Sequence, residues 1–257
     1  MTDAYILANM TWPEAKQALE RVELAILPVG SFEQHAPYMT FEVDTARAYG
    51  FGRLLAERLY PRVLLAPPIT MGISHHHMSF PGTITLRHET FQSVVLDVVW
   101  SLRQHGIRQF LLVNGHGGNN PSLEVMIVRL RHELGVQVAL ANPTSLAGEV
   151  SRARMIPENL GHCGQGETSQ AMYLAPHVVK EDRIVPGAMK GYPYKWVGRA
   201  GGINYPYAWE EITSNGALGD ATSASAELGK EMIDAALKKT TEFLVDFMDK
   251  NAGHKKA

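Results

Sequence analysis

The sequence contains very little cysteine, no long apolar run and no excess of positive charge. Its one cysteine, Cys163, excludes a disulfide within the chain, so a reducing compartment is expected. No apolar stretch reaches the roughly 18 residues that a membrane-spanning helix requires, and the first twenty residues lack the basic start and apolar centre of a signal peptide. These absences predict a cytoplasmic protein that does not enter a membrane.

The charge balance argues against two further classes of partner. The 24 lysines and arginines nearly match the 26 aspartates and glutamates, and the formal net charge is −2. A nucleic acid or an anionic membrane would require a basic surface. A small molecule is therefore the expected ligand.

Short apolar runs alternate along the chain with longer segments of helical periodicity. This alternation predicts βαβ units, and hence an α/β fold in which helices cover both faces of a largely parallel sheet. Thr11, with Glu14 three residues later, is the expected cap of the first helix, and Asp44 or Thr45 is the expected cap of the second. The expected strands lie within 23–30, 61–72, 107–114 and 136–142, and the expected helices within 11–22, 44–60, 89–106, 121–135 and 223–250.

Residues 187–219 do not follow this alternation. They are rich in glycine, proline, tyrosine and tryptophan and have little periodicity. Because aromatic residues are enriched at interfaces, we expect an insertion that covers a site or contacts another subunit. The alternative is a loop folded over its own core.

Residues that commonly bind metals follow three of the predicted strands. Glu33 and His35 follow the first, residues 75–77 are three histidines after the second, and His116 follows the third. In an open parallel sheet, ligands bind outside the carboxyl ends of the strands. These side chains are therefore expected to share one edge of the sheet.

The stretch "FEQHAPYMTFEVD" holds the first group, Glu33, His35 and Asp44. Glu33 and His35 point to the same side of an extended chain, and carboxylate and imidazole together suit Zn²⁺ or Mn²⁺. The alternative is that Glu33 and His35 are solvated loop residues and that Asp44 only caps a helix.

The stretch "VNGHGGNN" places His116 among glycines and asparagines directly after a strand. Glycines let the backbone approach a ligand closely, although a glycine-rich turn with an exposed histidine is the simpler alternative. The pattern is no phosphate-binding loop, because it lacks both the spaced glycines and the lysine of such loops.

The stretch "GHCGQGETS" brings His162 and Glu167 together in a glycine-rich approach to a helix. The position of Glu167 at the start of a helix would by itself be explained by the favourable interaction of a carboxylate with the helix dipole. Cys163 raises the alternative of a thiol nucleophile, which is weakened by the absence of obvious partners for it.

Taken together, these stretches resemble the creatininase (creatinine amidohydrolase) family, and the resemblance covers most of the chain. It implies a three-layer α/β/α sandwich with a mainly parallel central sheet, formed by a single creatininase-like domain over residues 1–257. It also implies a centre of two divalent ions, Zn²⁺, Mn²⁺ or Fe²⁺, and a homohexamer. The motifs that carry it are "LPVGSFEQH", "VDT", "FPGT", "NGHGGN" and "GHCGQGETS" followed by "YLAP".

Carried over by position, the resemblance implies that Glu33, Asp44 and His116 hold one ion. His35, Asp44 and Glu167 would hold the other, with Asp44 bridging. Two such ions would lower the pKa of a bound water, and the resulting hydroxide would attack a carbonyl carbon.

Two histidines receive catalytic roles from the same resemblance. His162 stands where the family has a histidine that assists the transition state and passes a proton to the leaving nitrogen. His77, just before "SFPGT", is a candidate for contact with the substrate.

The chain departs from creatininase itself at several positions. Gly117 and Gly118 follow the histidine of "NGH" where creatininase has a tyrosine and a glutamate, so the extra glutamate near the first ion is missing. Glu158 stands in place of a tryptophan that encloses creatinine, and Ala36 and Tyr38 replace common glycine and histidine residues. The "NGHGGN" form is more similar to the branch of formamide hydrolases, the mycofactocin peptidase and a diketo-inositol hydrolase, so creatinine is not the expected substrate.

Three functions remain open from the sequence. The first is a dinuclear metal hydrolase of a non-peptide amide C–N bond, cyclic or formyl, in a small polar metabolite. The second is a ring-opening hydrolase of a diketo-inositol of the 3-dehydro-scyllo-inosose type. The third is a non-catalytic binding protein on the same fold, which the full set of ligand-type residues disfavours.

Overall fold

The computed structural model describes residues 4–198 and 202–255 and is built around a parallel sheet. The strand order is β1-β3-β2-β4-β5, and each neighbouring pair runs parallel. The predicted α/β architecture is confirmed. The strands are β1 (Tyr5–Ile6), β2 (Leu24–Val29), β3 (Val63–Leu65), β4 (Gln109–Asn114) and β5 (Gln137–Ala141).

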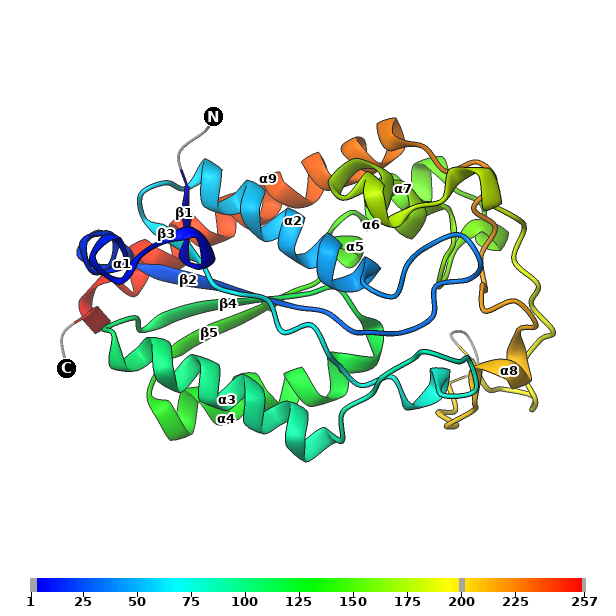
Figure 1. Cartoon of the computed structure of the whole chain (residues 1–257), viewed down its shortest axis with the longest axis horizontal. Helices are drawn as coiled ribbons and strands as arrows, with labels where there is room; N and C mark the ends of the chain where they lie inside the picture. The colour runs from blue at the N-terminus through cyan, green and yellow to red at the C-terminus, as the bar shows by residue number, and fades with distance from the viewer. Residues whose placement is uncertain (1–3, 199–201, 256–257) are drawn as a thin grey trace.

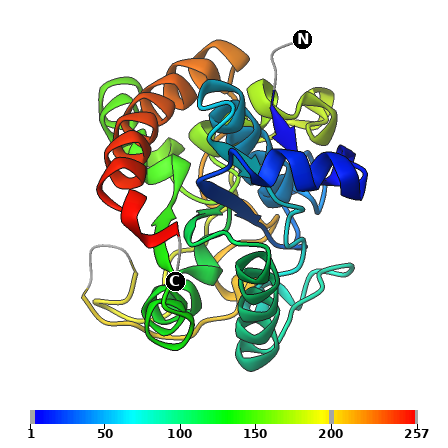
Figure 2. The ribbon, with the colours of Figure 1, turned by 90° about the vertical axis from the view of Figure 1, so that its left-hand side faces the viewer.

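Helices cover both faces of this sheet, as Figures 1 and 2 show: α2 and α9 lie on one side, and α3 and α4 on the other. None of the helices within the described ranges combines the length and the apolar character needed to cross a membrane. The main helices are α1 (Trp12–Leu19), α2 (Val43–Arg58), α3 (His88–Gln104), α4 (Asn120–Leu134), α7 (Gln165–Leu174) and α9 (Ala226–Lys250), with short α5 (Pro143–Leu146) and α6 (Gly148–Arg154).

Strand β2 shows why the sheet is buried on both faces. Leu24 and Ile26 pack with residues of α2 and α9, whereas Ala25 and Leu27 pack with residues of α3 and α4. All six residues of β2 are buried, which explains the continuous apolar run in the sequence.

The two predicted helix caps have different outcomes. Thr11 and Glu14 form the expected capping box at the start of α1, with the Thr11 amide donating to Glu14 Oε2 at 2.6 Å. The prediction for α2 was wrong, because Glu42 is its N-cap and Asp44 lies inside the first turn. The Asp44 carboxylate instead accepts a hydrogen bond from Ser31 after β2, so it faces the sheet edge.

The sheet has a switch point between β2 and β4. The chain leaves β2 through α2 to reach β3 on one side, and it leaves β4 through α4 to reach β5 on the other. Because the two connections diverge, the loops after β2 and β4 open a crevice at their carboxyl ends.

The irregular segment lies at one end of the molecule. Between residues 187 and 219, the described part contains one short helix, α8 (Trp209–Ile212). Figure 1 shows α8 at the right-hand end, away from both termini.

Candidate metal centre

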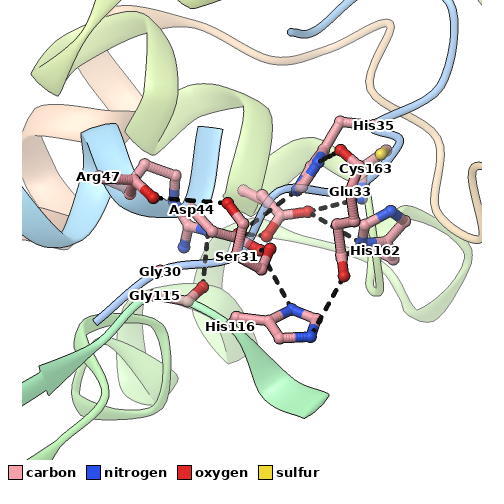
Figure 3. Close-up of polar contacts among 12 residues, drawn as sticks. Gly30, Ser31, Glu33, His35, Asp44, Arg47, Gly115, His116, His162 and Cys163 are labelled. Carbon is pink, nitrogen blue, oxygen red and sulfur yellow. Dashed lines mark hydrogen bonds and ion pairs between the residues drawn. The ribbon is translucent and has the colours of Figure 1, made fainter. Parts of the chain in front are cut away.

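The five predicted metal ligands meet at the switch point. Glu33 and His35 follow β2, Asp44 lies in the first turn of α2, His116 follows β4, and Glu167 lies in the first turn of α7. Figure 3 shows Glu33, His35, Asp44 and His116 turned toward one another. The predicted gathering at one sheet edge is therefore observed.

Glycine allows the loop after β4 to approach helix α2. A side chain on Gly115 would place its Cβ 2.1 Å from the carbonyl oxygen of Asp44. Any other residue would push the two segments apart, and with them His116 and Asp44.

Asp44 joins the two sides of the cluster. Its Oδ1 lies 3.3 Å from His35 Nε2, and its Oδ2 lies 3.1 Å from His116 Nδ1. The other nitrogen of His116 lies 3.2 Å from Glu33 Oε2. Each of these four side chains is at most 5% exposed, so their charges must be balanced within the protein.

Glu167 closes the cluster from α7. Its Oε2 accepts a hydrogen bond of 2.7 Å from the backbone amide of Cys163 and lies 3.7 Å from His162 Nδ1. Its Oε1 accepts a hydrogen bond of 2.7 Å from Arg47. Its carboxylate is thus fixed toward the other ligands.

Four overlapping triplets have one ligand atom each within 4.8 Å of the others. They share members with the two predicted ligand sets but reproduce neither as a whole, so the division of ligands between two ions stays a prediction. The triplets are Glu33, His35 and Asp44; His35, His162 and Glu167; Glu33, His76 and His116; and Glu33, His77 and His162.

The electrostatics of the cluster favour a bound cation. Burial alone would lower the pKa of His35, but the Asp44 carboxylate beside it raises that pKa to about 9. Burial likewise opposes charge on His116, yet Glu33 and Asp44 raise its pKa well above its usual value. The carboxylates thus hold protons on both imidazoles, at positions where a metal ion would supply the positive charge instead.

Unsatisfied atoms provide a separate test of whether a metal fits. Among the described residues, Glu33 Oε1 and His35 Nε2 are buried and make no hydrogen bond. Buried polar atoms that lack a hydrogen bond are costly, and both are atoms that coordinate Zn²⁺, Mn²⁺ or Fe²⁺. The residues present therefore fit divalent ions.

The two predicted catalytic histidines flank Glu33. His162 Nδ1 lies 3.8 Å from Glu33 Oε1, while His162 Nε2 lies 3.1 Å from the backbone oxygen of Gln34. His77 is 1% exposed, with Nδ1 2.8 Å from the Gln34 side-chain amide and Nε2 3.3 Å from Glu33 Oε1. Gln34, which the sequence analysis did not single out, thus orients both rings.

The Cys163 thiol does not support the alternative of a sulfur nucleophile. The side chain is fully buried, and burial, reinforced by Glu167, raises the pKa of the thiol well above its usual value. The backbone of Cys163 has the structural role, because its oxygen accepts a hydrogen bond from Tyr38 and its amide donates to Glu167.

Arg47 is a second residue that sequence reasoning missed. Its guanidinium is nearly fully buried and donates to Glu167 Oε1 at 2.7 Å and Gln170 Oε1 at 2.9 Å. It also contacts Asp44 Oδ1 and the backbone oxygen of Gly115, both at 3.4 Å. Arg47 therefore links α2, α7 and the loop that carries His116.

Replacing Arg47 with methionine is expected to destabilise the metal-free protein by about 3–5 kcal/mol, because buried carboxylates lose their counter-charge. Urea denaturation would measure the loss, which should shrink when Zn²⁺ is added. Arg53→Met on the same helix is the control, since Arg53 is half-exposed and forms an exposed ion pair with Glu57, so its effect should be below about 1 kcal/mol. Equal effects of the two substitutions would refute the linking role.

The cluster opens into a cavity of about 480 Å³. Glu33, Asp44 and Glu167 lie along it, and Tyr192, Tyr207 and Trp209 of the irregular segment line it as well. Three aromatic side chains of the irregular segment therefore form part of the cavity wall, and that residues 187–219 cover the site stays a prediction.

The creatininase (creatinine amidohydrolase) family matches residues 8–244. The chain belongs to the creatininase family. The family's named members are hydrolases, so this chain is an enzyme of that class.

Three curated relatives span most of the chain. A mycofactocin precursor peptide peptidase of Mycobacterium ulcerans is 31% identical over a match that covers 89% of this chain and 85% of that protein. A 3-dehydro-scyllo-inosose hydrolase of Thermotoga maritima is 26% identical, covering 94% and 83%. A creatinine amidohydrolase of Pseudomonas putida is 26% identical, covering 93% and 95%.

Solved creatininases share the fold. A manganese creatininase is 25% identical with a TM-score of 0.78, covering 96% of this chain and 99% of that one. A creatininase variant of Zn-Zn type gives the same identity, TM-score and coverage. The α/β sandwich predicted from the resemblance is therefore confirmed.

Proposed function

We propose that this creatininase-family chain uses two divalent ions, Zn²⁺, Mn²⁺ or Fe²⁺, to hydrolyse a non-peptide amide C–N bond, cyclic or formyl, in a small polar metabolite. The observation that carries the proposal is the position of Asp44 between His35 and His116. A carboxylate that faces an imidazole on each side is suited to bridging two cations.

Five side chains are the proposed ligands of the two ions. Glu33, Asp44 and His116 would hold one ion, and His35, Asp44 and Glu167 the other. When bound, such ions supply an activated water and polarise the scissile carbonyl.

We assign proton transfer to His162. Its Nδ1 faces Glu33 and Glu167, and its side chain lines the cavity, so it is placed to deliver a proton to a leaving nitrogen. His77 is more deeply buried, and its two ring nitrogens face Gln34 and Glu33. That position favours orienting Glu33, although contact between His77 and the substrate stays a prediction.

The cavity favours a neutral substrate with a flat group. Within residues 4–198 and 202–255, its lining includes carboxylates and histidines but no lysine or arginine, so an anionic substituent would find neither of these side chains to pair with. Tyr192, Tyr207 and Trp209 offer ring faces for stacking. A cyclic amide, or a formamide on a ring, fits this lining.

The named relatives suggest the comparison that tests the bond type. Purified enzyme loaded with Zn²⁺, Mn²⁺ or Fe²⁺ should be incubated with cyclic amides, formamides, short peptides and a diketo-inositol. The proposal expects turnover of a cyclic amide or formamide. Turnover of the diketo-inositol alone would favour ring opening, as in the Thermotoga maritima relative, and turnover of peptides alone would overturn the non-peptide assignment.

Trp209→Ala is expected to raise KM by about tenfold, which corresponds to about 1.4 kcal/mol of aromatic contact with the substrate. The Trp209 ring lies 5.4 Å from the His162 ring, centroid to centroid, so kcat should also fall. Trp100→Ala is the matched control, because Trp100 is exposed on α3 and should leave both constants unchanged. If Trp209→Ala leaves KM unchanged, the Trp209 ring does not contribute to substrate binding.

We also propose that the chain forms a single catalytic domain, is cytoplasmic and assembles as a homohexamer. The irregular segment exposes Tyr194, Trp196 and Tyr205, which suits a contact between subunits. Gel filtration that gives a monomer would exclude the hexamer.

A further inference from the structure

We propose that His76 is an additional ligand of the ion held by Glu33 and His116. This inference rests on the proposed metal centre and extends it to a residue outside the five predicted ligands. It concerns the middle residue of "HHH", in a one-turn 3-10 helix, η2 (His75–His77).

The distances place His76 within reach of that ion. Glu33, His76 and His116 each offer a ligand atom within 4.8 Å of the other two. The rings of His76 and His116 lie nearly parallel, with centroids 5.7 Å apart and 10° between their planes. Both residues line the same cavity, so an ion at Glu33 and His116 would lie beside the His76 ring.

Gly118 provides the space that His76 occupies. A Cβ at Gly118 would lie 2.9 Å from His76 Cε1, 2.4 Å from His116 Nε2 and 2.4 Å from the backbone oxygen of Ile73. Even an alanine would therefore displace one of the two imidazoles.

The surroundings of His76 hold its ring in place and leave its nitrogens available. Trp209 packs against it at 64° with centroids 5.1 Å apart, and the His77 ring lies 4.3 Å away. Within the described part of the chain, His76 has no hydrogen-bond partner for either ring nitrogen, whereas His77 Nδ1 lies beside Gln34. His76 is a partly buried imidazole whose nitrogens are free of hydrogen bonds to the described residues, and a neutral imidazole nitrogen is a common metal ligand.

A second imidazole changes the chemistry of the site. Glu33, His116 and His76, together with Asp44, would give two nitrogen and two oxygen donors. Imidazole suits Zn²⁺ and carboxylate suits Mn²⁺, so adding an imidazole to a set made mainly of carboxylates moves the preference toward Zn²⁺. The inferred ligand therefore predicts a first site that prefers Zn²⁺ over Mn²⁺.

The test measures metal binding directly. The number of Zn²⁺ ions bound and their Kd would be determined by competition with a chromophoric chelator for the wild type, His76→Gln and His76→Glu. His76→Gln should weaken one of two sites by at least about tenfold, because even partners of metal ligands contribute 10–100-fold. His76→Glu should restore binding and shift the preference toward Mn²⁺.

His75→Gln is the matched control. His75 is exposed and stacks on His88, with ring centroids 5.9 Å apart, so both Zn²⁺ sites should keep the wild-type Kd. Tight binding at both sites in His76→Gln, alongside its loss in Glu33→Gln, would overturn the role of His76 and leave the proposed function standing. A wild type that binds no ion would instead overturn the proposed function itself.

Discussion

Asp44→Asn is expected to lower kcat/KM by about a thousandfold or more and to prevent stable binding of at least one ion. The carboxylate lies between His35 and His116, and each of its oxygens faces one of these rings. Asparagine has a similar shape but no charge, and it presents an amide to one of the two rings. Losing the transition-state stabilisation that a metal supplies costs several kcal/mol, at tenfold for each 1.36 kcal/mol.

Steady-state kinetics and elemental analysis on the same preparation would test this expectation. Glu42→Gln is the matched control, since Glu42 precedes Asp44 by two residues but is exposed at the start of α2. It should retain both metal and activity. An Asp44→Asn variant with full metal content and full activity would exclude a bridging role.

Removing the metal with a chelator is expected to abolish activity and to lower the unfolding temperature by roughly 5–10 °C. An ion at 100 times its Kd stabilises the folded state by about 2.7 kcal/mol, and 1 kcal/mol shifts the unfolding temperature of a chain of this size by about 2–4 °C. Without the ions, Glu33 Oε1 and His35 Nε2 stay buried without hydrogen bonds. Calorimetry before and after dialysis against chelator would measure the shift.

Adding back Zn²⁺, Mn²⁺ or Fe²⁺ should restore both activity and unfolding temperature. The Glu33→Gln variant controls for effects of the chelator itself, because a chain that has already lost a metal ligand should shift less on chelation. If chelation leaves the activity of the wild type unchanged, metal-dependent hydrolysis is wrong for this protein.

Periodicity and strand-end position were enough to predict strands β2 to β5 and the edge at which the site lies, but not the two-residue edge strand β1. The continuous apolar run of β2 could only be buried on both faces, and the same reading placed Glu33 and His116 at neighbouring strand ends. The glycine-rich stretches marked where backbones approach closely, as Gly115 does against Asp44.

The remaining contacts depend on tertiary structure that local patterns do not encode. Nothing in the local sequence distinguishes Arg47 from other helix residues, yet it contacts Glu167, 120 positions away. Neither Asp44 nor Thr45 caps α2, and the Asp44 carboxylate faces His35 and His116, which come from two other segments. No feature of "HHH" in the sequence marks His76 as a ligand, and the space beside Gly118 that the ring occupies depends on the tertiary structure.

The most direct measurement is a crystal structure of protein purified without chelator, with anomalous scattering recorded at the metal absorption edges. We expect two peaks per chain, one among Glu33, Asp44 and His116 and the other among His35, Asp44 and Glu167. No peak at these residues in crystals grown with excess Zn²⁺ or Mn²⁺ would contradict it.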